Sequence, residues 1–291
     1  MSHTAAEIAS QPGLWVRSRE HTGQAERVLM APGDRLLMIG CGVSGYVAQC
    51  LAELREKGGF GETDAICASE YLPRRKYDRV VAVTRSGTTT DVLDALREVP
   101  PSTYAAAITA ARTTHLDELT DTQLLLDFAD ERAVVQTRFA TTVLALARHT
   151  YGENLEPVVT DARTAMAATL PADPVDVDHV VFLGTGWTVG LAHLAALTVR
   201  EMAQVSAESY PARDFRHGPI AMAGPRTLVW SLGDVPRDVD EAARSAGAVA
   251  YRNDGDPLAH LVLAQRFALA LATHRGLDPD HPRLLTRSVV R

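Results

Sequence analysis

The feature that most constrains the fold is a repeated alternation of short apolar runs with longer segments of helical period. This alternation predicts a parallel sheet covered by helices on both faces. The strands that we expect fall in two series, the first at 35–39, 79–84, 104–109 and 123–128, and the second at 179–183, 227–232 and 248–251. The sequence therefore predicts an α/β protein with two parallel sheets.

The two series begin in the same way. Residues 36–45 read LLMIGCGVSG and residues 180–190 read VVFLGTGWTVG, so each combines a buried strand, a glycine turn and the start of an alanine-rich helix. This repetition predicts an internal duplication. The proline-containing segment 171–176 lies between the series, and prolines interrupt helices. We expect a helical segment over 1–27, a first α/β domain over 28–152, a linker helix over 153–177 and a second domain over 178–291.

Charge and cysteine content exclude several classes of function. The net charge is −7, from 29 basic and 36 acidic residues, which offers no general attraction for nucleic acid or anionic lipid. The uncharged stretch 180–199 is interrupted by glycines and by His193, which favours strand, turn and helix over a membrane span. The three cysteines show no metal-ligand spacing, and the N-terminus has no secretory apolar core. We expect a cytoplasmic protein that binds no metal, nucleic acid or membrane.

The first glycine turn has two interpretations. Residues Gly40 to Gly45 satisfy G-x-G-x-x-G between a strand and a helix, which is the dinucleotide fingerprint. A nicotinamide site also needs an acidic residue at the end of the second strand. Glu62 and Asp64 precede the apolar stretch 65–68 instead of following it. A dinucleotide-dependent oxidoreductase therefore stays an alternative with weaker support.

A hydroxyl-rich segment is more informative. Residues 84–91 read TRSGTTTD, where a buried strand runs directly into a helix. Such a join points backbone N–H groups and the positive end of the helix dipole at one spot, and short hydroxyl side chains add neutral donors. The alternative is that Thr88 or Thr89 is an ordinary helix N-cap. Because one cap uses one hydroxyl and this segment has five, we predict a phosphate monoester site.

The turn and the hydroxyl segment together resemble those of the sugar isomerase (SIS) domain family, which binds phosphosugars. The resemblance covers nearly the whole chain and corresponds to the tandem SIS domains in the isomerase half of glucosamine-6-phosphate synthase. It implies two tandem SIS domains, each a parallel-sheet α/β/α sandwich. The phosphosugar ligands that it implies are Gly42, Val43, Ser44, Thr84, Arg85, Ser86 and Thr89.

Two further segments resemble parts of the sugar site in that family. Residues 134–138 read VVQTR and resemble its V-A-S-T-K segment, which implies a role for Gln136; we expect a helix over 134–147. The C-terminal tail resembles one whose lysine forms a Schiff base with the ketose. Arg287 stands at that position and cannot form an imine, because a guanidinium stays protonated. The resemblance places Arg287 at the sugar site, where it would bind a substrate carboxylate; a surface ion pair is the alternative.

The most specific match concerns Glu201 and His217. The family has a glutamate and, sixteen residues later, a histidine in K-H-G-P; here residues 216–219 read RHGP. The resemblance implies that Glu201 moves a proton between C1 and C2 of an open-chain sugar and that His217 opens the ring. Both roles suit the side chains, since a carboxylate can abstract a proton beside a carbonyl and an imidazole exchanges protons near neutral pH. Each residue alone could equally be structural.

These features together predict an enzyme that acts on a 6-phosphorylated sugar or amino sugar without a cofactor. It would be an isomerase, deaminase or deglycase, and we expect no glutaminase activity. The resemblance also implies a homodimer in which His217 of one subunit completes the site of the other. A phosphosugar-binding regulatory protein without catalytic activity is the alternative.

Overall fold

The chain divides into two compact units in the computed structural model, which describes residues 2–72 and 75–291. The five-stranded unit comprises Gly13–Glu131, Arg138–Leu155 and Thr286–Arg291. The four-stranded unit comprises Met1–Pro12, Arg132–Thr137 and Glu156–Leu285. The domain boundaries expected from the sequence stay a prediction.

The five-stranded unit is built on a parallel sheet with the strand order β2-β1-β3-β4-β5. Its strands are β1 (Leu36–Gly40), β2 (Thr63–Cys67), β3 (Arg79–Val83), β4 (Tyr104–Thr109) and β5 (Thr122–Leu125). Its helices are α2 (Thr22–Leu29), α3 (Val43–Lys57), α4 (Thr90–Arg97), α5 (Thr114–Leu119) and α6 (Arg138–Thr150). The part of α1 (His3–Ser18) from Gly13 onward also belongs to this unit. In this order the chain leaves β1 toward one side and returns to β3 on the other, and parallel sheets of this kind bind ligands beyond the carboxyl ends of the two strands where the order reverses, here β1 and β3.

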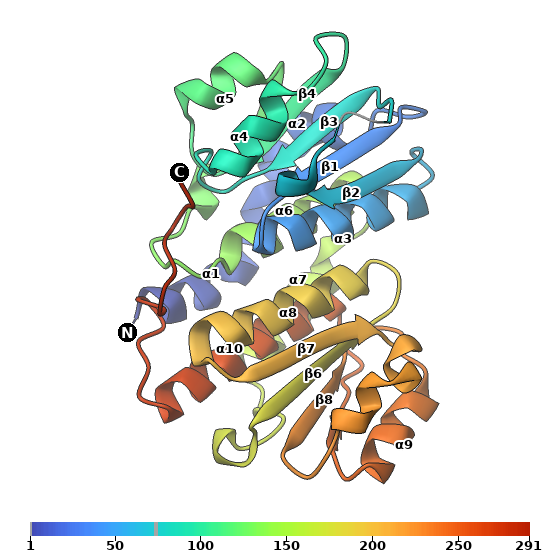
Figure 1. The fold of residues 1–291 in the computed structure, drawn as a ribbon, viewed down its shortest axis with the longest axis vertical. Coiled ribbons are helices and arrows are strands. Elements are labelled where there is room, and N and C mark those ends of the chain that lie inside the picture. The colour runs from blue at the N-terminus through green and yellow to red at the C-terminus, as the bar shows by residue number, and fades with distance from the viewer. Residues whose placement is uncertain (1, 73–74) are drawn as a thin grey trace. The chain divides into compact units, whose positions relative to one another are not determined.

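The four-stranded unit repeats the start of this arrangement. Its parallel sheet has the order β7-β6-β8-β9, with β6 (His179–Gly184), β7 (Ser206–Pro211), β8 (Thr227–Ser231) and β9 (Val249–Tyr251). Its helices are α7 (Leu155–Ala167), α8 (Thr188–Ala203), α9 (Arg237–Ser245) and α10 (Pro257–His274). The expected α/β fold with two parallel sheets is thus confirmed (Figure 1).

Each sheet is covered by helices on both faces, and its central strands are buried along almost their whole length. In the five-stranded unit, α4 and α5 pack on one face and α2, α3 and α6 lie on the other (Figure 1). In the four-stranded unit, α9 covers one face, and Phe267 of α10 packs edge-on against Trp230 of β8 on the other. Within the described residues, no helix is long and apolar enough to cross a membrane.

Three local features differ from expectation. Strands β2 and β7 are absent from the expected set; both are edge strands with several polar residues and only partial burial, so they lack a continuous apolar run. The helix expected over 134–147 was wrong at its start, because α6 begins at Arg138. The buried Glu131 carboxylate accepts hydrogen bonds from the backbone N–H groups of Arg138 (3.2 Å) and Phe139 (3.1 Å), and this stabilises the helix start there.

Candidate functional site

The glycine turn after β1 brings backbone and helix start close together. A Cβ atom on Gly40 would lie 2.7 Å from the backbone carbonyl of Ser44, so only glycine fits where α3 begins beside the strand. The same close approach recurs in the other unit, between Gly184 and the backbone of Thr188. Gly42 has a φ of 54°, and Val43 and Ser44 open α3 as buried residues. The N-terminus of α3 is therefore held at the carboxyl end of β1.

The hydroxyl loop, residues 84–89, follows β3 and leads into α4. Thr84 Oγ1 accepts a hydrogen bond from Gly87 N (3.2 Å), and Ser86 Oγ accepts one from Thr88 N (3.3 Å). Gly87 has a φ of +67°, which turns the chain toward α4, and its carbonyl accepts a hydrogen bond from Thr113 Oγ1 (3.2 Å). The loop and the turn after β1 follow the carboxyl ends of the neighbouring strands β3 and β1, where the strand order of this sheet reverses.

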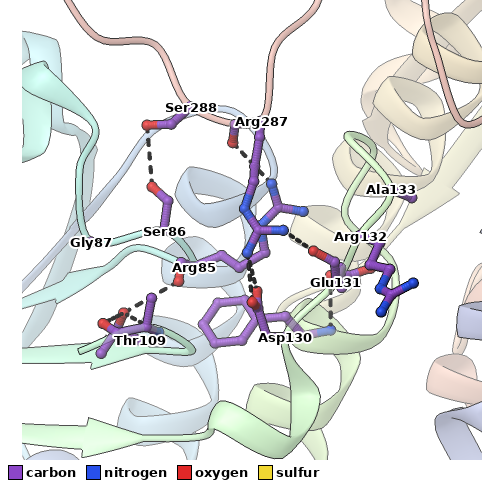
Figure 2. Close-up of polar contacts among 12 residues, drawn as sticks. Arg85, Ser86, Gly87, Thr109, Asp130, Glu131, Arg132, Ala133, Arg287 and Ser288 are labelled. Carbon is purple, nitrogen blue, oxygen red and sulfur yellow. Dashed lines mark hydrogen bonds and ion pairs between the residues drawn. The ribbon is translucent and has the colours of Figure 1, made fainter. Parts of the chain in front are cut away.

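The C-terminal tail, residues 286–291, contacts the hydroxyl loop directly, as Figure 2 shows for its two labelled residues. Ser288 Oγ accepts hydrogen bonds from Ser86 Oγ (3.2 Å) and Thr88 Oγ1 (3.0 Å), and lies 3.4 Å from Thr89 Oγ1. The backbone follows the same path, since Thr90 N donates to Val289 O (3.1 Å). Short hydroxyl side chains from two distant segments therefore meet at the N-terminus of α4.

Two arginines lie beside this group of hydroxyls. Arg85 is 1% exposed and donates a hydrogen bond to the backbone carbonyl of Arg287 (2.9 Å). Arg287 Nη2 lies 2.5 and 2.6 Å from the two carboxylate oxygens of Asp130, and Arg287 Nη1 donates to the Glu131 carbonyl (Figure 2). Asp130 is a residue that the sequence reasoning missed, because nothing local links it to a segment 157 positions away.

The corresponding turn of the four-stranded unit has its hydroxyls engaged internally. Thr185 Oγ1 donates to the Asp234 carbonyl (2.6 Å), and Thr188 Oγ1 donates to the Leu232 carbonyl (2.9 Å). Thr188 Oγ1 also accepts from Thr185 N (2.8 Å). These side chains hold their own backbone, so this turn presents no cluster of mobile hydroxyl donors.

Glu201 and His217 both belong to the four-stranded unit. Glu201 is half-buried in the last turn of α8, which Gln204 ends in a left-handed conformation (φ 51°). His217 is exposed at the end of the short 3₁₀ helix Asp214–His217 and borders a pocket of about 390 Å³ with Arg213, Arg216 and Asp238. An exposed imidazole at a pocket rim is accessible to a ligand.

Helix α8 also carries His193, a histidine that was not predicted as a site residue from the sequence. His193 Nδ1 lies 2.8 Å from Ser209 Oγ of β7, eight residues before Glu201 on the same helix. Burial, and then the positive charge of Arg200, hold the pKa of His193 below its usual value. The imidazole is therefore neutral at physiological pH.

Gln136 lies in the segment Arg132–Thr137, which also belongs to the four-stranded unit. Its side-chain oxygen is buried and has no hydrogen-bond partner among the described residues. Buried polar atoms are normally paired, so such an oxygen fits a position that a ligand completes. The structure thus brings together Thr84, Arg85, Ser86, Thr89 and Arg287 in the five-stranded unit, with Gly42, Val43 and Ser44 on the neighbouring turn, whereas Glu201, His217 and Gln136 lie in the other unit.

Metal and thiol chemistry find little support in the described residues. No group of three or more His, Cys, Asp or Glu side chains there could hold a metal ion. Burial, and then the neighbouring Cys67 thiol, raise the pKa of Cys41 to about 11, so this thiol beside the glycine turn stays protonated. The side chains already named can supply hydrogen bonding and proton transfer.

Comparison with known proteins gives matches over most of the chain. No protein-family model matches it. Glutamine–fructose-6-phosphate aminotransferase from Aeropyrum pernix is 30% identical over 97% of this chain and 56% of the relative. The same enzyme from Pyrobaculum aerophilum is 26% identical over 87% of this chain and 50% of the relative. The chain therefore spans about half the length of these relatives.

Solved structures match over the full length. Glucosamine-6-phosphate deaminase from Thermotoga maritima is 25% identical, with a TM-score of 0.81 and complete coverage of both chains. Tagatose-6-phosphate ketose/aldose isomerase from Escherichia coli shares the fold, with 19% identity, a TM-score of 0.79, and coverage of 96% of this chain and 95% of the other. The chain is thus similar in sequence and fold to proteins that are named for isomerase, deaminase and aminotransferase reactions of 6-phosphorylated sugars.

Proposed function

We propose that this chain is a phosphosugar enzyme of the SIS type, which converts a 6-phosphorylated sugar or amino sugar by enolisation at C1 and C2. The observation that carries the proposal is the group of hydroxyls from the loop at 84–89, which lies at the carboxyl ends of β1 and β3, where parallel sheets of this order bind their ligands. Neutral hydroxyl donors, backbone N–H groups and a helix N-terminus suit a phosphate monoester.

The proposed reaction uses two side chains. Glu201 accepts the proton from the carbon beside the carbonyl and returns it to the neighbouring carbon, through an enediol or enolamine. His217 opens the sugar ring by exchanging protons with the ring oxygen and the anomeric hydroxyl. Positioned acids and bases of this kind typically contribute a factor of about 10² to 10⁴ to a rate. The relatives with full-length structural similarity support this class, since one is a deaminase and another an aldose/ketose isomerase by name.

Arg287 distinguishes the proposed reaction from aminotransfer through an imine. A guanidinium supplies no amine for a Schiff base, and that of Arg287 is paired with Asp130. The two parallel sheets with matching glycine turns support a duplicated SIS domain. We further propose a homodimer in which the exposed His217 of one subunit serves the sugar site of the other.

A ligand screen with product analysis tests the function. The purified protein is heated with fructose 6-phosphate, glucosamine 6-phosphate, galactosamine 6-phosphate, tagatose 6-phosphate and 6-phosphofructosyl amino acids, and each mixture is analysed for product. A ligand that binds only the folded state raises the melting temperature. Stabilisation with conversion supports the enzyme, whereas stabilisation without conversion supports a regulatory phosphosugar sensor. No stabilisation by any phosphosugar refutes the phosphate site.

A further inference from the structure

The C-terminal tail is attached to the five-stranded unit at both of its ends. At its start, Arg287 pairs with Asp130 and its carbonyl accepts a hydrogen bond from Arg85. At its end, Arg291 pairs with Asp91 (3.1 Å) and its backbone N–H donates to Thr90 Oγ1 (2.9 Å). Two ion pairs on either side of Ser288 restrict where its side chain can lie.

Ser288 lies at the centre of the cluster of hydroxyl side chains. Its oxygen lies within 3.0 to 3.4 Å of the hydroxyl oxygens of three loop residues, Ser86, Thr88 and Thr89. Since it accepts from both Ser86 and Thr88, its own proton can be donated either to Thr89 Oγ1 at 3.4 Å or to a ligand. Hydrogen bonds in such a chain polarise one another, so two donors that converge on Ser288 make its O–H a stronger donor.

The Asp130–Arg287 ion pair holds the tail, and with it Ser288, in place. Both oxygens of Asp130 contact Nη2 of the guanidinium, and Nη1 donates to the Glu131 carbonyl. Contacts through two nitrogens fix the direction of the side chain as well as its distance. Thr286 Oγ1 donates to the Ser288 carbonyl (2.9 Å) and fixes the tail on the other side of Arg287. The tail is thereby oriented with Ser288 toward the loop, as Figure 2 shows for Ser86 and Ser288.

We propose that Ser288 is a further hydroxyl ligand of the phosphate, and that Asp130 is a positioning residue that acts on the phosphate site through Arg287. This inference rests on the proposed function, because it assumes a phosphate at the hydroxyl loop. In it, Ser288 donates its proton to a phosphate oxygen and Thr88 keeps Ser288 oriented, while the hydroxyl proton of Ser86 rotates from Ser288 toward the phosphate. Arg287, paired with Asp130, then anchors the tail.

The test measures binding of inorganic phosphate, fructose 6-phosphate and unphosphorylated fructose to the full chain by calorimetry. Ser288→Ala is expected to weaken binding of both phosphate ligands about tenfold, since a hydrogen bond to a charged group is lost. Ser288→Thr keeps the hydroxyl and is expected to stay within about twofold of wild type. Unphosphorylated fructose is expected to respond to neither change.

Asp130→Asn tests the positioning role. We expect binding about threefold weaker, with no additional loss when the change is combined with Ser288→Ala, because Asp130 acts through that hydroxyl. Asp127→Asn, an exposed carboxylate three residues earlier, is the matched control and is expected to bind as wild type does. Equal melting temperatures for all variants would show that any loss of binding is not a loss of fold.

The outcomes separate this inference from the proposed function. If wild type binds phosphosugars and Ser288→Ala binds them equally well, the tail hydroxyl is not a ligand and only the inference fails. If Ser288→Ala binds more tightly, Ser288 competes with the phosphate and the inference is again wrong. If wild type binds no phosphate ligand at all, the proposed function and the inference both fail.

Discussion

Replacing Gly87 with alanine tests whether the hydroxyl loop is held in one conformation for binding. The residue has a φ of +67°, and a Cβ there would lie 2.9 Å from Leu116 Cδ1 and 3.0 Å from Thr113 Cγ2. A left-handed residue with a Cβ costs about 1–2 kcal/mol. Crowding a packed site costs a further ~1–3 kcal/mol. We therefore expect Gly87→Ala to lower the free energy of unfolding by about 3 kcal/mol.

Gly276 provides a matched control, because it has the same φ of +67° and nothing within 4 Å of the added Cβ. Gly276→Ala should therefore show the backbone cost alone, about 1–2 kcal/mol. Binding should separate the two variants further. In Gly87→Ala the Cβ displaces Thr113, whose hydroxyl bonds the Gly87 carbonyl, and the loop shifts with it.

Urea denaturation followed by circular dichroism gives the free energies, and calorimetry with inorganic phosphate gives the affinities. We expect Gly87→Ala to bind phosphate at least tenfold more weakly than wild type, and Gly276→Ala to bind it normally. The reasoning is refuted if both variants lose the same stability and both keep the affinity of wild type. In that case the loop would tolerate displacement, and its geometry would not govern binding.

Three further predictions concern the four-stranded unit. Glu201→Gln should reduce turnover at least a hundredfold while the affinity for phosphosugar stays within about twofold, because only the proton acceptor is removed. Product assays and calorimetry on one preparation check both quantities. Full activity would contradict the role of Glu201 as a base. Mixing inactive Glu201→Gln and His217→Ala proteins should restore part of the activity if subunits exchange and share sites, and no recovery after co-refolding would count against His217 acting across the interface. Burial lowers the pKa of His260, so the folded state takes up a proton less readily than the unfolded chain. The contribution of neutral His260 to stability is then complete above about pH 6.5 and is lost as the pH falls below that value. His260→Leu should therefore flatten this part of a curve of unfolding free energy against pH. An unchanged slope would contradict the prediction.

The central strands could be predicted from the sequence because burial on both faces demands continuous apolar runs. Strands β1 and β6 have that pattern, whereas the edge strands β2 and β7 carry polar residues such as Asp64 and Glu208 and gave no comparable signal. The glycine turns and the hydroxyl loop could also be predicted from the sequence, because their residues are contiguous and the residue types reflect local backbone geometry.

The tail contacts could not be predicted in the same way. Ser288 contacts residues about 200 positions away, and Asp130 contacts Arg287 across 157 positions. A serine and an aspartate in loops are common residues, so neither type nor spacing indicates a partner. The start of α6 has a similar cause, because the group that stabilises it is Glu131, seven residues before Arg138 and outside the usual capping position.

The internal bonding of the second glycine turn bears on binding stoichiometry. Because Thr185 and Thr188 donate to carbonyls of their own unit, an anion at that turn would have to displace two existing hydrogen bonds before gaining any. In the loop at 84–89, Ser86 and Thr88 donate to another hydroxyl, Ser288 Oγ, so their protons can rotate toward an anion without leaving a backbone carbonyl unpaired. The chain is therefore expected to saturate at one phosphosugar equivalent, with none bound at the turn after β6.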